Sequence, residues 1–151
     1  MRSSKQIGGA AAARNRRVCG RNCSVEAGCV RIASKIISDL LWHTISYMDY
    51  HEDYYHAFLA GLFVGRGGYI VQSNKEHGLG RPDIDLRDKA NRRAIIIEAK
   101  KSDSAEKMAL DCDEAIDQIK KNQYAANMDG YTQIFCYGIS FFKKSALVKK
   151  M

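Results

Sequence analysis

The stretch RAIIIEAK, residues 93–100, constrains the fold most strongly, because three consecutive isoleucines run directly into charged residues. Isoleucine is β-branched and favours strands, and a continuous apolar run presents apolar side chains to both faces of a sheet. We therefore expect a central strand of an α/β protein, covered on both faces. Glu98 and Lys100 stand in this strand, where a charge needs a partner or a function.

The segment before it brings further carboxylates toward this strand. GRPDIDLR, residues 80–87, is predicted as a strand, and the polar DKANR, residues 88–92, as the turn between the two strands. A turn centred between Ala90 and Asn91 places Asp83 opposite Glu98. Lys100 lies on the same face as Glu98, because side chains alternate along a strand. The pattern predicts that two carboxylates and one ammonium group meet on one patch of the sheet.

Such a patch suits metal-assisted hydrolysis. Two facing carboxylates repel each other unless a proton or a cation lies between them. Mg²⁺ and Mn²⁺ prefer oxygen ligands, commonly one or two carboxylates with water and substrate phosphate. A nearby lysine can orient or help to deprotonate an attacking water and offset charge on phosphorus. An ordinary cross-strand ion pair is the alternative, but the apolar character of the strand favours a functional site.

The remaining segments predict a small mixed sheet of about four or five strands flanked by helices, in the order α-β-β-β-α-β-β. Helices are expected from residue 32, over about 50–64 and over about 105–128, and further strands at YIVQSN (69–74), GYTQIFCYGISFF (130–142) and SALVKK (145–150). Asp49 with Glu52, and Asp103 with Glu106, are predicted capping boxes. The long helix between two strands predicts a parallel crossover, and the short turns predict antiparallel pairs.

The charge of the chain is concentrated at its beginning. Of the net +7, residues 1–31 contribute +6 (seven Lys or Arg and one Glu), which leaves +1 for residues 32–151. We predict a disordered or poorly structured basic tail over residues 1–31 and a single domain over residues 32–151. The net charge is therefore weak evidence for nucleic-acid binding by the folded part.

The cysteines and the absence of long apolar runs predict a cytoplasmic protein with no membrane segment. The five cysteines are an odd number, and no secretory signal precedes them, which favours reduced thiols. Cys19, Cys23 and Cys29 follow a C-x3-C-x5-C spacing that matches common zinc sites poorly. No apolar run is long enough to cross a bilayer.

The pair Pro82–Asp83, followed by EAK at residues 98–100, resembles the PD-(D/E)xK nuclease superfamily. Longer stretches resemble, in order, the nuclease-like domain at the C-terminus of AAA-ATPase-like proteins, which are mostly bacterial: YHEDYYHAFLAGLF, SNKEHGLGRPDIDL, AIIIEAK, EAIDQIKKNQYA and YGISFFKKSALV. They extend over about residues 44–149. The resemblance implies a restriction-endonuclease-like core.

Carried over by position, the resemblance implies a metal site. Asp83 and Glu98 would bind Mg²⁺ or Mn²⁺, with the backbone carbonyl of Ala99 as a further ligand, and Lys100 would be the catalytic lysine. Glu52 falls where many members place an extra carboxylate for the metal or its water shell. A capping box with Asp49 is the alternative role of Glu52.

Further residues are assigned structural or substrate-contacting roles. Gln118 and Tyr124 match a helix motif in which the Gln approaches the active site or the substrate backbone. Gln118 lies at the edge of the predicted buried stripe of this helix, so it can instead face water; the stripe consists of Met108, Cys112, Ala115 and Ile119. Tyr124 suits a core position. Arg81 could contact phosphate or a carboxylate. Asp85 is interpreted as part of an ion pair, and His56 as a packed or hydrogen-bonded helix histidine.

The resemblance and the patch together predict a hydrolase, a metal-dependent nuclease that cleaves phosphodiester bonds, with DNA as its nucleic-acid partner. The alternative is a catalytically weak or inactive nuclease-fold module that binds or regulates, attached to an AAA-ATPase-like partner. The chain has no G-x-x-x-x-G-K-[ST] loop, so such a partner would be a separate module.

Overall fold

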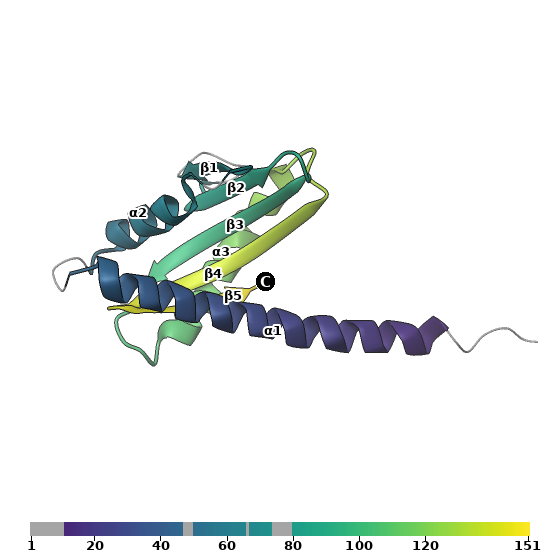
Figure 1. The fold of residues 1–151 in the computed structure, drawn as a ribbon, viewed down its shortest axis with the longest axis horizontal. Coiled ribbons are helices and arrows are strands. Elements are labelled where there is room, and N and C mark those ends of the chain that lie inside the picture. Colours follow the sequence, from purple (N-terminus) through teal and green to yellow (C-terminus); the bar gives the residue numbers. More distant parts are fainter. Residues whose placement is uncertain (1–10, 47–49, 66, 74–79) are drawn as a thin grey trace, which may run out of the picture.

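A computed structural model describes residues 11–46, 50–65, 67–73 and 80–151. Within these ranges, three α-helices flank one mixed sheet of five strands, so the predicted α/β class and order of strands are confirmed (Figure 1). The elements are α1 (Ala11–Thr44), α2 (Glu52–Phe63), β1 (Ile70–Ser73), β2 (Ile84–Asp88), β3 (Arg93–Lys101), α3 (Met108–Lys121), β4 (Gln133–Phe142) and β5 (Ser145–Lys150). A short 3-10 turn, Tyr124–Asn127, follows α3.

The strands lie in the order β1-β2-β3-β4-β5, so β3 is central. β3 and β4 are parallel and are connected through α3, which confirms the predicted crossover, and the other neighbours are antiparallel. The β2–β3 hairpin pairs Ile84 with Ile97 and Asp88 with Arg93. This is the register predicted from a turn between Ala90 and Asn91.

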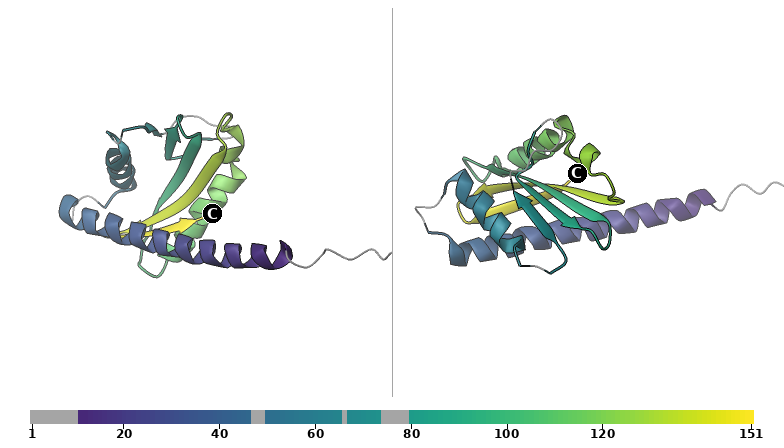
Figure 2. Two further views of the ribbon diagram at one scale, coloured as in Figure 1. Left: turned by 45° about the vertical axis from the view of Figure 1, so that its right-hand side comes forward. Right: turned by 90° about the horizontal axis from the view of Figure 1, so that it is seen from above.

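Helices cover both faces of the sheet, with α3 on one face and α1 and α2 on the other (Figure 2). Ile97 is buried in the cluster that contains residues of α1 and α2. Ile96 is buried in the second cluster, together with Ile119 and Tyr124. The three isoleucines therefore serve both faces, as expected for a central strand.

Helix α1 begins at Ala11, well before the helix start predicted at Ile32. The Ala- and Arg-rich sequence from residue 11 has high intrinsic helix propensity, which needs no amphipathic period. The helix thus differs from the poorly structured tail expected for residues 1–31, of which residues 1–10 lie outside the described part. The domain boundary at residue 32 stays a prediction.

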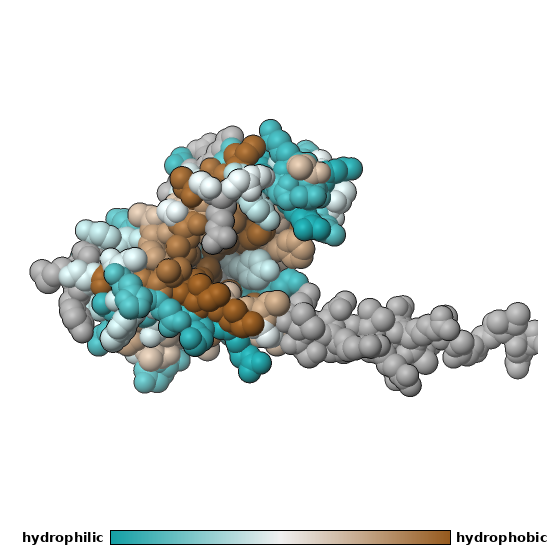
Figure 3. All heavy atoms as spheres, in the orientation of Figure 1, coloured by the Kyte–Doolittle hydropathy of each residue, from teal (hydrophilic) through white to brown (hydrophobic). Residues whose placement is uncertain are grey.

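The apolar side chains along the second half of this helix are only partly buried. Ile37 and Leu41 join the core, whereas Ile32 and Ile36 are 60% and 52% exposed. The exposed side chains form an apolar band along α1 on the face seen in Figure 3. Over the described residues, no helix combines the length and the apolar composition needed to cross a membrane.

Two serines of α1 cover the outer edge of the sheet. The hydroxyl oxygens of Ser34 and Ser38 accept hydrogen bonds of 2.9 Å from the backbone N–H groups of Val148 and Ala146 in β5. These amides point away from β4, and an edge strand with unpaired backbone groups can pair with other chains. The contact satisfies the edge of β5 and fixes α1 on the sheet.

Both predicted capping boxes differ from the observed helix starts. Glu52 is the first residue of α2, His51 is its N-cap residue without a side-chain cap, and Asp49 lies outside the described residues. α3 begins at Met108 instead of near Ala105, and Asp103 contacts the ammonium group of Lys107 at 3.5 Å. The capping role therefore does not explain the presence of Glu52.

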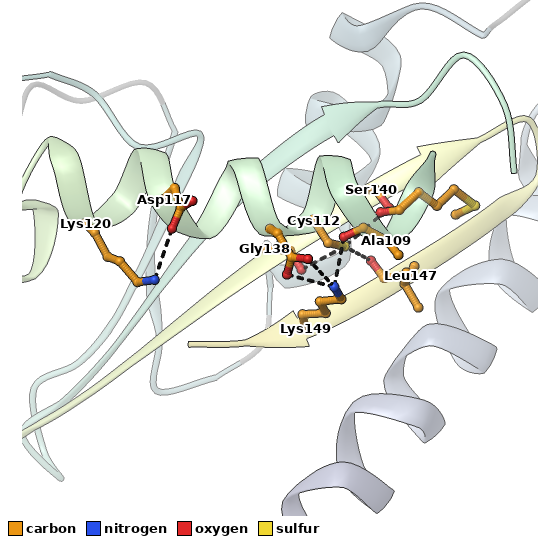
Figure 4. A network of polar contacts seen from close by, with 10 residues as sticks. Ala109, Cys112, Asp117, Lys120, Gly138, Ser140, Leu147 and Lys149 are labelled. Atoms are coloured by element: carbon orange, nitrogen blue, oxygen red, sulfur yellow. Dashed lines mark hydrogen bonds and ion pairs between the residues drawn. The ribbon is translucent and has the colours of Figure 1, made fainter. Parts of the chain in front are cut away.

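Helix α3 lies close to β4 and β5 because small and hydrogen-bonding residues line the contact (Figure 4). The predicted buried stripe is confirmed and consists of Met108, Cys112, Ala115 and Ile119, with Ile116 in addition. The Ser140 hydroxyl donates to the Met108 carbonyl at 2.7 Å, and the Lys149 ammonium group contacts both Asp113 oxygens at 2.7 Å. These contacts fix the position of α3 on the sheet and therefore the position of Gln118.

Gly138 makes the close approach possible, and Gly138→Ala is expected to destabilise the protein by about 2 kcal/mol through overpacking. A Cβ at this position would lie 2.5 Å from the Cys112 carbonyl oxygen. The free energy of unfolding can be measured by urea titration followed by circular dichroism. Gly61→Ala in α2 is the control, because its added Cβ has no atom within 4 Å beyond its chain neighbours and the surrounding helix backbone. An unchanged free energy of unfolding in Gly138→Ala would contradict the close packing of α3 against β4.

Candidate active site

The candidate site lies where β2 begins and the second half of β3 passes α3. Asp83 immediately precedes β2, while Glu98 and Lys100 belong to β3 and share the face of the sheet that α3 covers. Glu98 is only 2% exposed, and the Asp83 side chain is 13% exposed. The site is therefore largely shielded from water on the side of the strands.

Asp83 and Glu98 are linked through the backbone. The Ala99 N–H donates to Asp83 Oδ2 at 2.7 Å, and the Asp83 N–H lies 3.4 Å from Glu98 Oε2. Each carboxylate therefore receives an amide from the segment that carries the other. The structure thus brings together the two carboxylates that the hairpin register predicted to face each other.

Gln118 joins the lysine to the buried glutamate. The Lys100 ammonium group donates to Gln118 Oε1 at 2.6 Å, and Gln118 Nε2 donates to Glu98 Oε1. Of the two alternatives for this edge position, the structure shows the side chain directed toward the candidate site. Residues from β3 and α3 therefore meet in one chain of hydrogen bonds.

Helix α2 contributes His56, which was expected to be a packed or hydrogen-bonded helix histidine and not a general base. His56 Nε2 lies 3.3 Å from Asp83 Oδ2 and 3.9 Å from Glu52 Oε1. Glu52 itself is about half-exposed, and its negative charge contributes to the raised pKa of Asp83. The spacing of Glu52 and His56, four residues apart on a helix, was the available signal, because such residues share one face.

Burial sets the electrostatics of the two carboxyls. The pKa of Glu98 is raised to about 8, chiefly by burial and also by the neighbouring Asp83 carboxyl, while Lys100 opposes the shift. Burial also raises the pKa of Asp83, opposed by the hydrogen bond from the Ala99 N–H and by the electrostatic effects of His56 and Lys100. A buried carboxyl with a raised pKa favours either a proton or a cation beside it.

The chemistry of the donor set fits a divalent cation with oxygen ligands. Within the described ranges, no three side chains of His, Cys, Asp or Glu are grouped so that they could hold a metal ion by themselves. Mg²⁺ typically takes one or two carboxylates and completes its shell with water and substrate phosphate. Asp83 and Glu98 supply two carboxylates, and their raised pKa values show that a positive charge would be favourable there.

A polar groove of about 560 Å³ opens beside the site. Its walls combine Lys100 of β3 with residues of α3 and its C-terminal end, which are Glu114, Asp117, Gln118, Lys121 and Asn122. The groove gives solvent access to the lysine, although Glu98 itself is buried. A separate apolar hollow of about 340 Å³ lies elsewhere, and the described residues that line it, Phe63, Tyr69, Leu86 and Ile95, include no carboxylate or ammonium group.

Asp85 stands apart from the site, as predicted. Its carboxylate is buried and forms an ion pair of 2.7 Å with the Arg87 guanidinium group on the same strand. This pair raises the pKa of Arg87. Asp85 therefore has a structural explanation that Asp83 and Glu98 lack.

The sequence model of one protein family, described as the PD-(D/E)XK nuclease superfamily, matches residues 50–151. The match covers more than half of the chain and includes α2, α3 and every strand of the sheet. No curated protein and no solved structure matches the chain.

Proposed function

The chain belongs to the PD-(D/E)XK nuclease superfamily, and from this premise we propose that it is a metal-dependent nuclease that hydrolyses phosphodiester bonds in DNA. The observation that carries the proposal is the meeting of Asp83, Glu98 and Lys100 at one end of a buried hairpin. A purely structural ion pair would place the lysine on a carboxylate. Here Gln118 stands between Lys100 and Glu98, so this lysine, within the part of the chain that the structure describes, does not form an ion pair with either Asp83 or Glu98.

Asp83 and Glu98 would hold Mg²⁺ or Mn²⁺, together with the backbone carbonyl of Ala99. When bound, the cation would supply Lewis-acid polarisation of the phosphate and would lower the pKa of a water molecule. Glu98 would release its proton on binding, because its ionised form is disfavoured in the protein without a cation. The Ala99 N–H keeps Asp83 Oδ2 oriented for this role.

The other polar residues would act on water and on the substrate. Lys100 would orient the attacking water and offset the charge that grows on the phosphate oxygens. Gln118 would hold the lysine in position and contact the substrate backbone in the adjoining groove. His56 would steady Asp83 from α2, and Glu52 would bind water at the exposed side of the site.

The direct test uses purified protein with supercoiled plasmid and with single-stranded DNA. We expect cleavage in Mg²⁺ or Mn²⁺ that stops when EDTA is added. Asp83→Asn keeps the shape of the side chain, removes its charge and is expected to abolish cleavage. No cleavage with either metal and either substrate, or cleavage that persists in Asp83→Asn, would count against the proposal.

One observation favours a second candidate, a binding or regulatory module that an AAA-ATPase-like partner would complete. Residues 32–151 carry a net charge of only +1, so charge alone gives this part little affinity for DNA. A salt titration of DNA binding, with the whole chain and with a chain lacking residues 1–31, distinguishes the two. Loss of all affinity with residues 1–31 would favour the second candidate.

A further inference from the structure

A buried tyrosine behind α3 holds the segment that leads to Asp83. Tyr124 lies in the 3-10 turn after α3 and is 1% exposed. Its hydroxyl donates to the backbone carbonyl of Arg81 at 2.9 Å and lies 2.8 Å from Asn122 Nδ2, which donates to it. The hydroxyl therefore has a donor and an acceptor partner, although it is withdrawn from water.

The local sequence is adapted to this contact. A Cβ on Gly80 would lie 3.1 Å from the Tyr124 hydroxyl oxygen, which is closer than most side-chain contacts. Glycine thus lets the segment pass directly over the ring. Pro82, which is buried, restricts the backbone between the anchored carbonyl and Asp83.

The anchored carbonyl belongs to the residue two positions before Asp83, so the contact determines where that carboxylate stands. Gln118 lies on α3, and Tyr124 lies directly after it, so one end of this helix touches both halves of the site. Gln118 holds Lys100 and Glu98 of β3, and Tyr124 holds the entry to β2. The hairpin register brings Asp83 near Glu98, but Asp83 lies just before the first paired residue of β2, so the backbone ladder does not itself hold this residue in place.

We propose that Tyr124 is a positioning residue, which acts through the Arg81 carbonyl to fix Asp83 relative to Glu98 and Lys100. The catalytic meaning of this role rests on the proposed nuclease function. The anchoring itself does not, because it concerns the backbone of the protein without metal or substrate. Asn122 extends the link to the polar groove, since its side chain lines that groove and donates to the same hydroxyl.

Tyr124→Phe removes the hydroxyl and keeps the ring in its packed place. We expect amide hydrogen exchange over Gly80–Asp83 to become about fivefold faster, the size of one net hydrogen bond. Tyr55→Phe is the matched control, because the buried Tyr55 hydroxyl also donates to a backbone carbonyl, that of Lys143, at 2.8 Å. The control should change global stability to a similar degree and leave exchange at Gly80–Asp83 unchanged.

A second variant reaches the same contact from the other side. Gly80→Ala keeps every hydrogen-bonding group but introduces the crowded Cβ, so it should also speed exchange at Asp83. Unchanged exchange in both Tyr124→Phe and Gly80→Ala would overturn the proposal. An equal acceleration in Tyr55→Phe would also overturn it, because the effect would then reflect general loosening.

Metal binding gives a readout that separates positioning from stability. Calorimetric titration with Mn²⁺ should show an affinity about fivefold weaker in Tyr124→Phe and unchanged in Tyr55→Phe. If the chain cleaves DNA, Tyr124→Phe should lower kcat more than it changes KM. Faster exchange without any cleavage by the unaltered chain would refute the proposed function and leave the positioning role supported. Weaker Mn²⁺ binding without faster exchange would contradict anchoring as the cause.

Discussion

Replacing Lys100 with Met is expected to lower metal-dependent DNA cleavage by about 1,000-fold while the fold is retained. The substitution keeps the unbranched apolar stem and removes only the ammonium group, which donates to Gln118. A positioned donor that meets charge developing in the transition state typically contributes about 100- to 1,000-fold, and a lysine that also orients water lies at the upper end. Initial rates on labelled DNA, at saturating Mg²⁺, measure the effect.

Lys101→Met is the matched control for this prediction. Lys101 is the next residue of β3 and is exposed, and its side chain points to the opposite face of the sheet. The control removes the same charge from the chain. An equal loss of activity in Lys101→Met would therefore mean that the effect reflects only general electrostatic attraction of DNA. Circular dichroism and thermal unfolding establish that both variants are folded. Near-normal cleavage by Lys100→Met would show that Lys100 has no catalytic role.

The sheet could be predicted because its determinants are local. Three isoleucines at residues 95–97 demand apolar contacts on both faces, and a short polar turn fixes the hairpin register once its centre is known. The observed pairing of Ile84 with Ile97 is the register that places Asp83 against Glu98. One correct turn thus predicted the relative positions of both carboxylates and of Lys100.

The ends of the helices and the exposed surface could not be predicted in the same way. Helix propensity extends α1 to Ala11 without any apolar period, and tertiary packing decides that Ile37 is buried while Ile36 remains exposed. The predicted capping boxes had the right residues at the right spacing. The chain nevertheless starts both helices elsewhere, because local hydrogen bonds of this strength are easily outweighed by packing.

Contacts between distant segments account for what the sequence missed in the site. The approach of His56 to Asp83 depends on how α2 crosses the sheet, and the bond from Tyr124 to the Arg81 carbonyl depends on how α3 ends. Neither contact follows from a motif, since both partners of each pair have ordinary alternative roles. The sequence predicted the residues in β2 and β3, and packing determines which helical residues support them.

The site is expected to lower the stability of the metal-free protein as the pH rises from about 4.5 to about 8. Glu98 has a pKa of about 8 in the folded chain, against an ordinary value of 4.5. Between these two values the folded state keeps a proton that the unfolded chain has lost, so stability is full below about pH 4.5 and falls as the pH rises toward 8. Because one pKa unit corresponds to about 1.4 kcal/mol, the complete loss is on the order of 5 kcal/mol.

Glu98→Gln should remove most of this loss, because the amide cannot ionise and has nearly the same shape. In EDTA, urea unfolding at pH 5 and pH 8 is expected to show a steep decline for the unaltered chain and a much smaller decline for Glu98→Gln. The exposed Glu114→Gln serves as the control and should keep the decline. Glu98→Gln should also abolish cleavage, and it should remove the additional stabilisation that Mg²⁺ gives at pH 8. Equal pH dependence of Glu98→Gln and the unaltered chain would mean that Glu98 ionises normally, and the case for a cation beside it would then rest on geometry alone.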